Sequence, residues 1–145
     1  MKQCVLILCT GNSARSQIAE GLLRHLAADR FDVFSAGSKP SIVNPLAIQV
    51  MVERGIDIHT HRSKHLSEYL NQPFDYVITV CDNAAETCPV FPGRAQRIHW
   101  SFPDPAAVTG DEARKLDVFR HTRDAIEERL KMWLEADMPP SEAGN

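Results

Sequence analysis

The residues best suited to chemistry in this sequence are its four cysteines, Cys4, Cys9, Cys81 and Cys88. A cysteine thiolate can be a nucleophile, a metal ligand or a redox group, depending on its surroundings. Cys9 directly follows an apolar run, and Arg15 stands six residues later. A loop between a strand and a helix can turn its N–H groups inward to hold a tetrahedral oxyanion. The spacing therefore predicts an oxyanion site with Cys9 as nucleophile.

The residues of this predicted oxyanion loop suit that task. Gly11 permits backbone conformations that other residues resist, and the planar fork of Arg15 can bind two oxygens at once. Arg15 and the helix N-terminus should both stabilise the Cys9 thiolate. The residues predicted to bind the oxyanion are Thr10, Gly11, Asn12, Ser13, Ala14, Arg15 and Ser16. The alternative is a buried cysteine beside a surface arginine, which the position between strand and helix disfavours.

Strand and helix patterns alternate along the chain. Apolar runs predict strands at 4–8, 32–36 and 75–80 and a weaker strand at 97–100. Amphipathic stripes predict one helix from the loop to residue 28 and others over 45–54, 63–70 and 111–136. Asn44 should cap one helix and Ser63 another. The pattern predicts a single α/β domain over 1–136, a doubly wound four-stranded parallel sheet flanked by helices, and a disordered tail over 137–145.

In such sheets, ligands bind beyond the carboxyl ends of the strands, where the strand order reverses. Cys9 follows the first strong strand and Cys81 ends the second, at 75–80, the third strand along the chain. We therefore expect the two thiols at the same edge of the sheet.

Composition narrows the class of protein. A formal net charge of −3 provides no basic field for nucleic acid, so a bound anion needs a local site. No apolar stretch is long enough to span a bilayer or to form a signal peptide. We expect a cytoplasmic monomer, and a reducing compartment favours core, metal-binding or reactive cysteines over a disulfide framework.

Zinc is the alternative role for the cysteines. The sequence has no C-x2-C pair, and the histidines at 59, 61, 65 and 99 show no ligand spacing with the thiols. We expect no metal site, with His59, His61 and His65 on a solvated loop.

Taken together, these motifs resemble a known family. The run from Cys9 to Gly21 resembles the phosphate loop and first helix of the low-molecular-weight tyrosine phosphatase fold, and more narrowly the thioredoxin-coupled arsenate reductases. The further matching pieces are Ser35-Ala36-Gly37, Asn44-Pro45, Val80-Cys81, Cys88-Pro89 and Asp104-Pro105. The resemblance covers nearly the whole chain up to the C-terminal tail.

The resemblance implies a relay of three thiols. Cys9 would attack arsenate, Cys81 would release arsenite by forming a disulfide with Cys9, and Cys88 would take over the bond to Cys81. Phosphate or sulfate could compete with arsenate. No tightly bound cofactor is implied. Thioredoxin is the expected external reductant, with glutaredoxin or mycothiol as alternatives. Cys4 matches no catalytic position, and we expect it in the core.

The segment between Cys81 and Cys88 bears on this relay. Seven helical steps span roughly 10 Å, whereas a disulfide needs α-carbons within about 7 Å. If the segment is helical in the reduced protein, it should unwind during turnover.

Loss of oxygen from arsenate requires a proton donor. Asp104 lies between Pro103 and Pro105, which restrict the loop and could aim the carboxyl group into the oxyanion site. The resemblance implies that Asp104 is the general acid. The alternative is that Asp104 only caps a turn.

Two other functions share these residues. A tyrosine phosphatase would use the same loop to form a phosphocysteine at Cys9, but Ala106 and Ala107 stand where such phosphatases carry aromatic residues. A non-catalytic redox sensor would use the disulfide alone. Certain arsenate reductases bind potassium near the positions of Glu20 and Ser35. Here we expect the ammonium group of Lys64 to replace that ion.

Overall fold

Four parallel strands form the centre of the computed structural model, which describes residues 2–82 and 87–137. These are β1 (Gln3–Cys9), β2 (Phe31–Gly37), β3 (Tyr76–Thr79) and β4 (Gln96–His99), in the order β2-β1-β3-β4. The predicted parallel sheet is confirmed. Because β1 has β2 on one side and β3 on the other, its carboxyl end is the point where the chain changes direction across the sheet.

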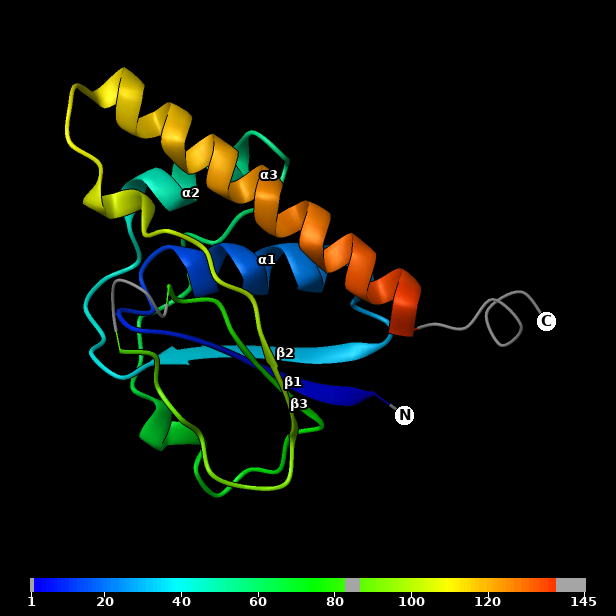
Figure 1. Ribbon diagram of the computed structural model, residues 1–145. Helices are drawn as coiled ribbons and strands as arrows, with labels where there is room; N and C mark the ends of the chain where they lie inside the picture. The colour runs from blue at the N-terminus through cyan, green and yellow to red at the C-terminus, as the bar shows by residue number, and fades with distance from the viewer. Residues whose placement is uncertain (1, 83–86, 138–145) are drawn as a thin grey trace.

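The three α-helices lie over one face of the sheet (Figure 1). They are α1 (Arg15–Ala27), α2 (Pro45–Val52) and α3 (Glu112–Asp137). The short 3-10 helix η1 (Leu66–Tyr69) lies on the other face, and η2 (Pro105–Ala107) precedes α3. The predicted cap at Asn44 is confirmed, since its side chain accepts a hydrogen bond from the Leu46 N–H at 2.8 Å.

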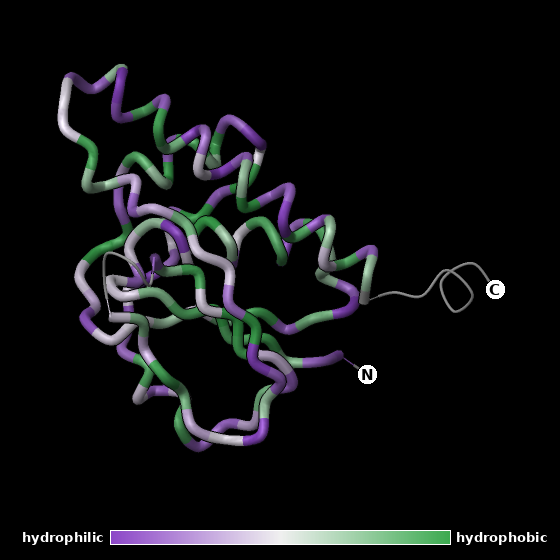
Figure 2. The backbone as a smooth tube through the Cα atoms, in the orientation of Figure 1, coloured by the Kyte–Doolittle hydropathy of each residue, from purple (hydrophilic) through white to green (hydrophobic). Residues whose placement is uncertain are grey.

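Strand β1 is apolar and buried from Val5 to Cys9, where both of its faces are covered. Val5 and Ile7 pack in the core under the helices, and Leu6 and Leu8 pack in a second core on the η1 face. In Figure 2, hydrophobic residues, coloured green, recur along the strands at the centre of the molecule. A strand buried on both faces holds the loop that follows it in a fixed position.

Arg123 interrupts the apolar stripe of α3 for a structural reason. Its side chain is buried, and its guanidinium donates to the Val50 carbonyl at 2.9 Å and to Glu53 at 2.8 Å. The arginine therefore satisfies a carbonyl near the carboxyl end of α2 and joins α2 to α3.

The end of the described chain lies in α3. Asp137 is the last residue of that helix, and the rest of the predicted tail lies outside the described residues. Within the described ranges, no helix has both the length and the apolar character needed to cross a membrane.

Candidate active site

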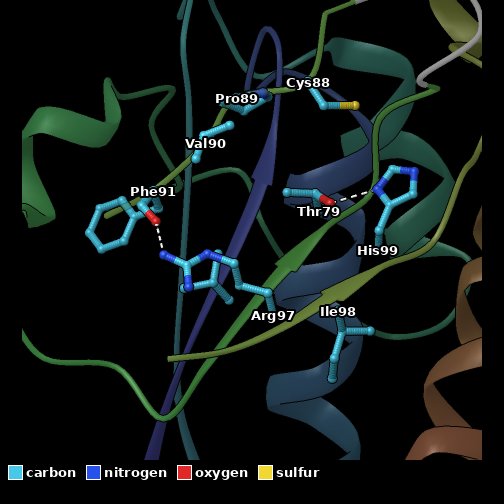
Figure 3. A pocket seen from close by; sticks show the side chains of 9 residues that line it. Thr79, Cys88, Pro89, Val90, Phe91, Arg97, Ile98 and His99 are labelled. Atoms are coloured by element: carbon cyan, nitrogen blue, oxygen red, sulfur yellow. Dashed lines mark hydrogen bonds between the residues drawn. The ribbon is translucent and has the colours of Figure 1, made fainter. Parts of the chain in front are cut away.

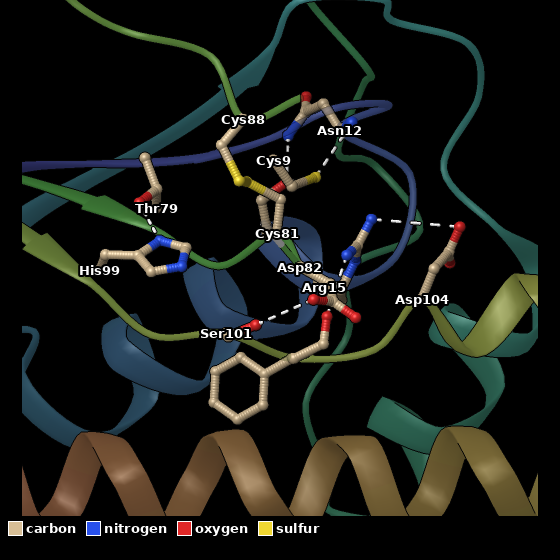
Figure 4. Close-up of a disulfide and its surroundings, with 12 residues drawn as sticks. Cys9, Asn12, Arg15, Thr79, Cys81, Asp82, Cys88, His99, Ser101 and Asp104 are labelled. Carbon is tan, nitrogen blue, oxygen red and sulfur yellow. Dashed lines mark hydrogen bonds and ion pairs between the residues drawn. A yellow bond between two sulfur atoms is a disulfide. The ribbon is translucent and has the colours of Figure 1, made fainter. Parts of the chain in front are cut away.

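The predicted oxyanion loop follows β1 and leads directly into α1. Leu8 is paired with Ala36 of β2 and Thr79 of β3, so the loop starts at the centre of the sheet edge. Beside it lies a cavity of about 220 Å³, whose lining residues are Cys9, Gly11, Ser13, Ala14, Arg15, Ser41, Asp104 and Ala106. The fold thus brings Cys9, Arg15 and Asp104 together, as the sequence predicts (Figure 4).

Cys9 is buried among hydrogen-bond donors. The Asn12 N–H points at its sulfur at 3.2 Å, and the hydroxyl of Ser16 lies 2.9 Å from the same atom. The N-terminus of α1 stands close by, because the helix begins at Arg15. Donors and a helix N-terminus favour a negative charge on sulfur, which is the nucleophilic form.

Arg15 and Asp104 both line the cavity. Arg15 is 4% exposed, and its guanidinium donates to the Phe102 carbonyl at 3.0 Å. A second guanidinium nitrogen lies 4.0 Å from a carboxylate oxygen of Asp104. The other carboxylate oxygen accepts a hydrogen bond from the Ala106 N–H, so Asp104 caps η2 and also faces the cavity. The capping interpretation of Asp104 is therefore confirmed, and its role as general acid stays a prediction. The Phe102 carbonyl is a positioning contact that no sequence pattern revealed.

Asn12 is the centre of the loop's hydrogen-bond network. It is fully buried and has a left-handed backbone conformation, with φ of 47°. The sequence favours Gly11 as the residue with an unusual backbone conformation, and this is wrong. Asn12 has the left-handed conformation instead, which asparagine tolerates better than most residues. The Asn12 side chain donates to the hydroxyls of Ser16 and Ser35 and accepts from the Gln17 side chain and the Lys64 N–H, at 2.8 to 3.0 Å.

Gly37 is a positioning residue that the sequence pattern marks only as the end of a strand. A Cβ atom at this position would lie 2.5 Å from the Thr10 carbonyl oxygen and 2.9 Å from the Asn12 nitrogen. The oxyanion loop therefore packs directly on the backbone of β2. Only glycine allows this close approach.

We expect Gly37→Ala to lower the free energy of unfolding by on the order of 1–3 kcal/mol, because the added methyl group must displace backbone atoms of the loop. Gly11→Ala is the matched control, since its Cβ would meet only ordinary contacts, the nearest at 3.7 Å. Urea denaturation of the two variants measures the difference. Equal stability of both variants would show that the loop yields freely.

Ser63 has a different role from the predicted one. The residue that caps η1 is His65, whose ring accepts from the Ser67 N–H at 3.0 Å. Ser63 instead donates to the Gly11 carbonyl and accepts from the Ser41 N–H, both at 2.9 Å. It therefore joins the oxyanion loop to the segment that forms another wall of the cavity.

His61 is also corrected, because it does not lie on a solvated loop. Its side chain is only 12% exposed, and Nδ1 lies 3.0 Å from the side-chain oxygen of Gln17. Its other nitrogen lies 3.9 Å from Glu20 and 3.4 Å from Arg24. The same Gln17 side chain donates a hydrogen bond to Asn12 and so links the imidazole to the oxyanion loop.

Burial lowers the pKa of His61 below its ordinary value of about 6.5, and the opposing charge of Glu20 does not reverse this. The neutral imidazole therefore adds stability that is present above about pH 6.5 and is lost as pH falls through the lower folded-state value. We expect wild type to lose more free energy of unfolding than His61→Gln between about pH 7.5 and pH 5. Denaturant titrations at both pH values test this, with the exposed His121→Gln as control. A loss as large in His61→Gln as in wild type would refute it.

Lys64 is buried beneath the loop near Glu20. Its ammonium group donates to the Arg62 carbonyl at 3.1 Å, and burial lowers its pKa while the charge of Glu20 raises it. Glu20 also accepts a hydrogen bond from Ser35. The replacement of potassium by this ammonium group stays a prediction. In the part of the chain that is described, no three His, Cys, Asp or Glu side chains gather as metal ligands.

Cys81 and Cys88 form a disulfide, with α-carbons 5.9 Å apart. Cys81 is fully buried just beyond β3, and Cys88 is half-buried. The Val80 N–H donates to the Leu8 carbonyl, so Cys81 and Cys9 follow neighbouring positions on adjacent strands. Cys9 keeps a free thiol. Residues 83–86 lie outside the described residues, so the expected unwinding of this segment stays a prediction.

Cys4 is not a core residue, contrary to the prediction. It is partly exposed, near the opposite end of β1 from Cys9. Its backbone N–H donates to Asp75 at 2.8 Å. Burial, followed by the charges of Asp32 and Asp75, raises the pKa of its thiol. These effects disfavour the reactive thiolate form of Cys4, which lies away from the site.

Comparison with known proteins identifies relatives over nearly the full length. The chain is 44% identical over 134 residues to an arsenate reductase of Halalkalibacterium halodurans, covering 92% of this chain and 96% of that protein. It is 41% identical over 131 residues to an arsenate reductase of Bacillus subtilis, covering 90% and 94%.

Solved structures agree with this assignment. An arsenate reductase in its oxidized state superposes with a TM-score of 0.75 at 32% identity, covering 89% of this chain and 94% of that one. A thioredoxin-dependent arsenate reductase of Corynebacterium glutamicum gives 0.70 at 29% identity, covering 93% of this chain and 61% of that longer chain. The model of the low molecular weight phosphotyrosine protein phosphatase family matches residues 4–139. The chain belongs to this family, alongside relatives that are arsenate reductases.

Proposed function

We propose that this protein reduces arsenate to arsenite through a relay from Cys9 to Cys81 to Cys88 and is regenerated by thioredoxin. The observation that carries the proposal is the arrangement of the three thiols. Cys9 has a free thiol and lines a cavity of about 220 Å³, and the Cys81–Cys88 disulfide lies at the same edge of the sheet. Hydrolysis of a phosphate ester would need only the first thiol.

The first step uses the cavity. Backbone N–H groups of the loop and the guanidinium of Arg15 hold the arsenate oxygens, and the Cys9 thiolate attacks arsenic. Asp104 donates a proton to the departing oxygen, which leaves as water. An Asp104 carboxylate oxygen lies 4.0 Å from the Arg15 guanidinium, which supports a proton donor close to the oxyanion that Arg15 would bind.

The second step reduces arsenic. The Cys81 thiolate attacks the Cys9 sulfur, and the electron pair of the sulfur–arsenic bond stays with arsenic, which leaves as arsenite. Cys9 and Cys81 have supplied the two electrons and are joined by a disulfide. Cys88 then attacks Cys81 and expels Cys9 as a thiolate, which the Asn12 N–H, Ser16 and the α1 N-terminus stabilise. A Cys81–Cys88 disulfide, such as the structure contains, is the expected product of this step, and thioredoxin would reduce it.

A phosphatase is the second candidate, since the family of the chain and the oxyanion loop both suit phosphate. Ala106 lines the cavity next to Asp104, so no aromatic side chain stands at that position to flank a phenyl ring. We therefore expect aryl phosphate hydrolysis only as a side activity.

The test is steady-state oxidation of NADPH by thioredoxin reductase and thioredoxin in the presence of arsenate, with arsenite measured directly. We expect continuous turnover with one arsenite formed per NADPH. Turnover with a glutaredoxin system and none with thioredoxin would replace the reductant while keeping the reaction. Hydrolysis of an aryl phosphate without arsenite formation would establish the phosphatase instead.

A further inference from the structure

A second cavity, separate from the oxyanion site, lies beside the disulfide. It has a volume of about 320 Å³ and is lined by Cys88 and the three residues that follow it, and by side chains of β3 and β4 (Figure 3). The lining residues most relevant to chemistry are Cys88, Thr79, Arg97 and His99. The relay makes Cys88 a nucleophile, yet Cys88 is not among the residues that line the oxyanion cavity.

His99 lines the same cavity as Cys88, and the sheet holds its side chain there. It is paired with Thr79 in the parallel register of β3 and β4, and its Nδ1 lies 2.6 Å from the Thr79 hydroxyl oxygen. Figures 3 and 4 both show the His99 ring on the same side of the sheet edge as the Cys88 sulfur, with open space between the two groups. Because Thr79 stands two residues before Cys81, the same strand positions the imidazole and one sulfur of the disulfide.

The charged groups around this cavity have other partners. The guanidinium of Arg97 donates to the carbonyls of Phe91 and Gly93. Asp82 follows Cys81 but does not line this cavity, and its carboxylate accepts a hydrogen bond from Ser101 at 3.3 Å. Among the side chains that line this cavity, the imidazole of His99 is of the chemical type that most often serves as a general acid or base.

We propose that His99 is the proton carrier for Cys88, an inference that rests on the proposed relay. His99 takes the proton of the Cys88 thiol, and the resulting thiolate attacks Cys81 in the Cys9–Cys81 disulfide. The Cys81–Cys88 bond forms, the Cys9–Cys81 bond breaks and Cys9 leaves as a thiolate. When an external dithiol later attacks Cys88, the protonated imidazole returns its proton to the departing Cys81 thiolate. Thr79 is a positioning residue that orients the ring.

The test follows the disulfide after a single addition of arsenate to the reduced protein without thioredoxin. Acid quenching and peptide mass mapping give the rate at which Cys9–Cys81 converts to Cys81–Cys88 between about pH 6 and pH 9.5. In His99→Gln we expect a rate at least about tenfold lower near pH 7. The deficit should close toward pH 9.5, where a thiol ionises without help. Thr79→Val should change the rate in the same direction but less.

His121→Gln, an exposed histidine on α3, is the matched control and should follow wild type. A pH profile of His99→Gln parallel to that of wild type, whatever its absolute rate, would overturn the proposal, because a structural role would lower the rate equally at every pH. The amount of arsenite separates a failure of the relay from a failure of the proposed role of His99. We expect one arsenite per protein in every variant. No arsenite from wild type would reject the relay itself, and the role of His99 with it.

Discussion

Replacement of Cys88 by serine should limit the protein to a single turnover. In Cys88→Ser, Cys9 and Cys81 can still supply two electrons to one arsenate, and the reaction should release one arsenite per protein. The resulting Cys9–Cys81 disulfide has no internal thiol to resolve it, because Cys81 is fully buried and its partner in the structure is the missing residue. Steady-state oxidation of NADPH should fall to background while the first arsenite is retained.

Quenched-flow measurement of arsenite distinguishes this result from simple inactivation. Peptide mapping of the stalled Cys88→Ser protein should find Cys9 linked to Cys81. Cys4→Ser is the matched control, because Cys4 is a partly exposed thiol at the far end of β1, and it should turn over like wild type. Sustained turnover of Cys88→Ser with thioredoxin would mean that the reductant attacks Cys9–Cys81 directly and that Cys88 is dispensable.

Replacement of Cys9 by serine should abolish both arsenate reduction and any hydrolysis of aryl phosphate. The hydroxyl of serine is a far weaker nucleophile at neutral pH, and the loss of a catalytic nucleophile costs many orders of magnitude, here at least about 10³-fold. The surrounding donors, Asn12 N–H and Ser16, can hydrogen bond an oxygen as well as a sulfur, so the loop should remain folded.

Two measurements check this together, the initial rates of both reactions and the midpoint of thermal unfolding of Cys9→Ser. A large loss of both rates with little change in the midpoint is the expected result. Retention of arsenate reduction by Cys9→Ser would move the nucleophile to another thiol and contradict the assignment of the cavity.

The positions of the main site residues follow from the sequence because they depend on local pattern. A continuous apolar run at 4–8 requires a strand buried on both faces, and the structure has that strand. The end of such a strand is fixed in space, so Cys9 and the loop to Arg15 are fixed with it. The parallel arrangement likewise places Cys81 at the same edge of the sheet.

The contacts that hold the loop in shape could not be predicted in the same way. The loop is held by tertiary contacts with residues distant in the sequence, namely Gly37, Ser63 and His61. No local sequence pattern predicts such contacts. Asn12, rather than Gly11, takes the left-handed conformation, because its side chain is the hub of four hydrogen-bond partners. A glycine would adopt the same backbone conformation but would leave those partners unsatisfied.

Cys4 is a residue for which the sequence pattern predicted too much burial. An apolar run predicts a buried strand, but it does not indicate where burial ends along that strand. The first residues of β1 lie at the rim of the sheet, where Asp75 and Asp32 surround the thiol. This rim position, remote from the oxyanion cavity, explains why Cys4 is no part of the proposed chemistry.

The proposed relay is tested most directly by the state of each thiol after reaction with one arsenate. Fully reduced wild-type protein should be mixed with one equivalent of arsenate in the absence of thioredoxin, quenched with acid and mapped by mass spectrometry. We predict one arsenite per protein, a Cys81–Cys88 disulfide, and Cys4 and Cys9 as free thiols. Three reduced relay thiols and no arsenite, with phosphate released from an aryl phosphate in a parallel sample, would contradict the relay and identify a phosphatase.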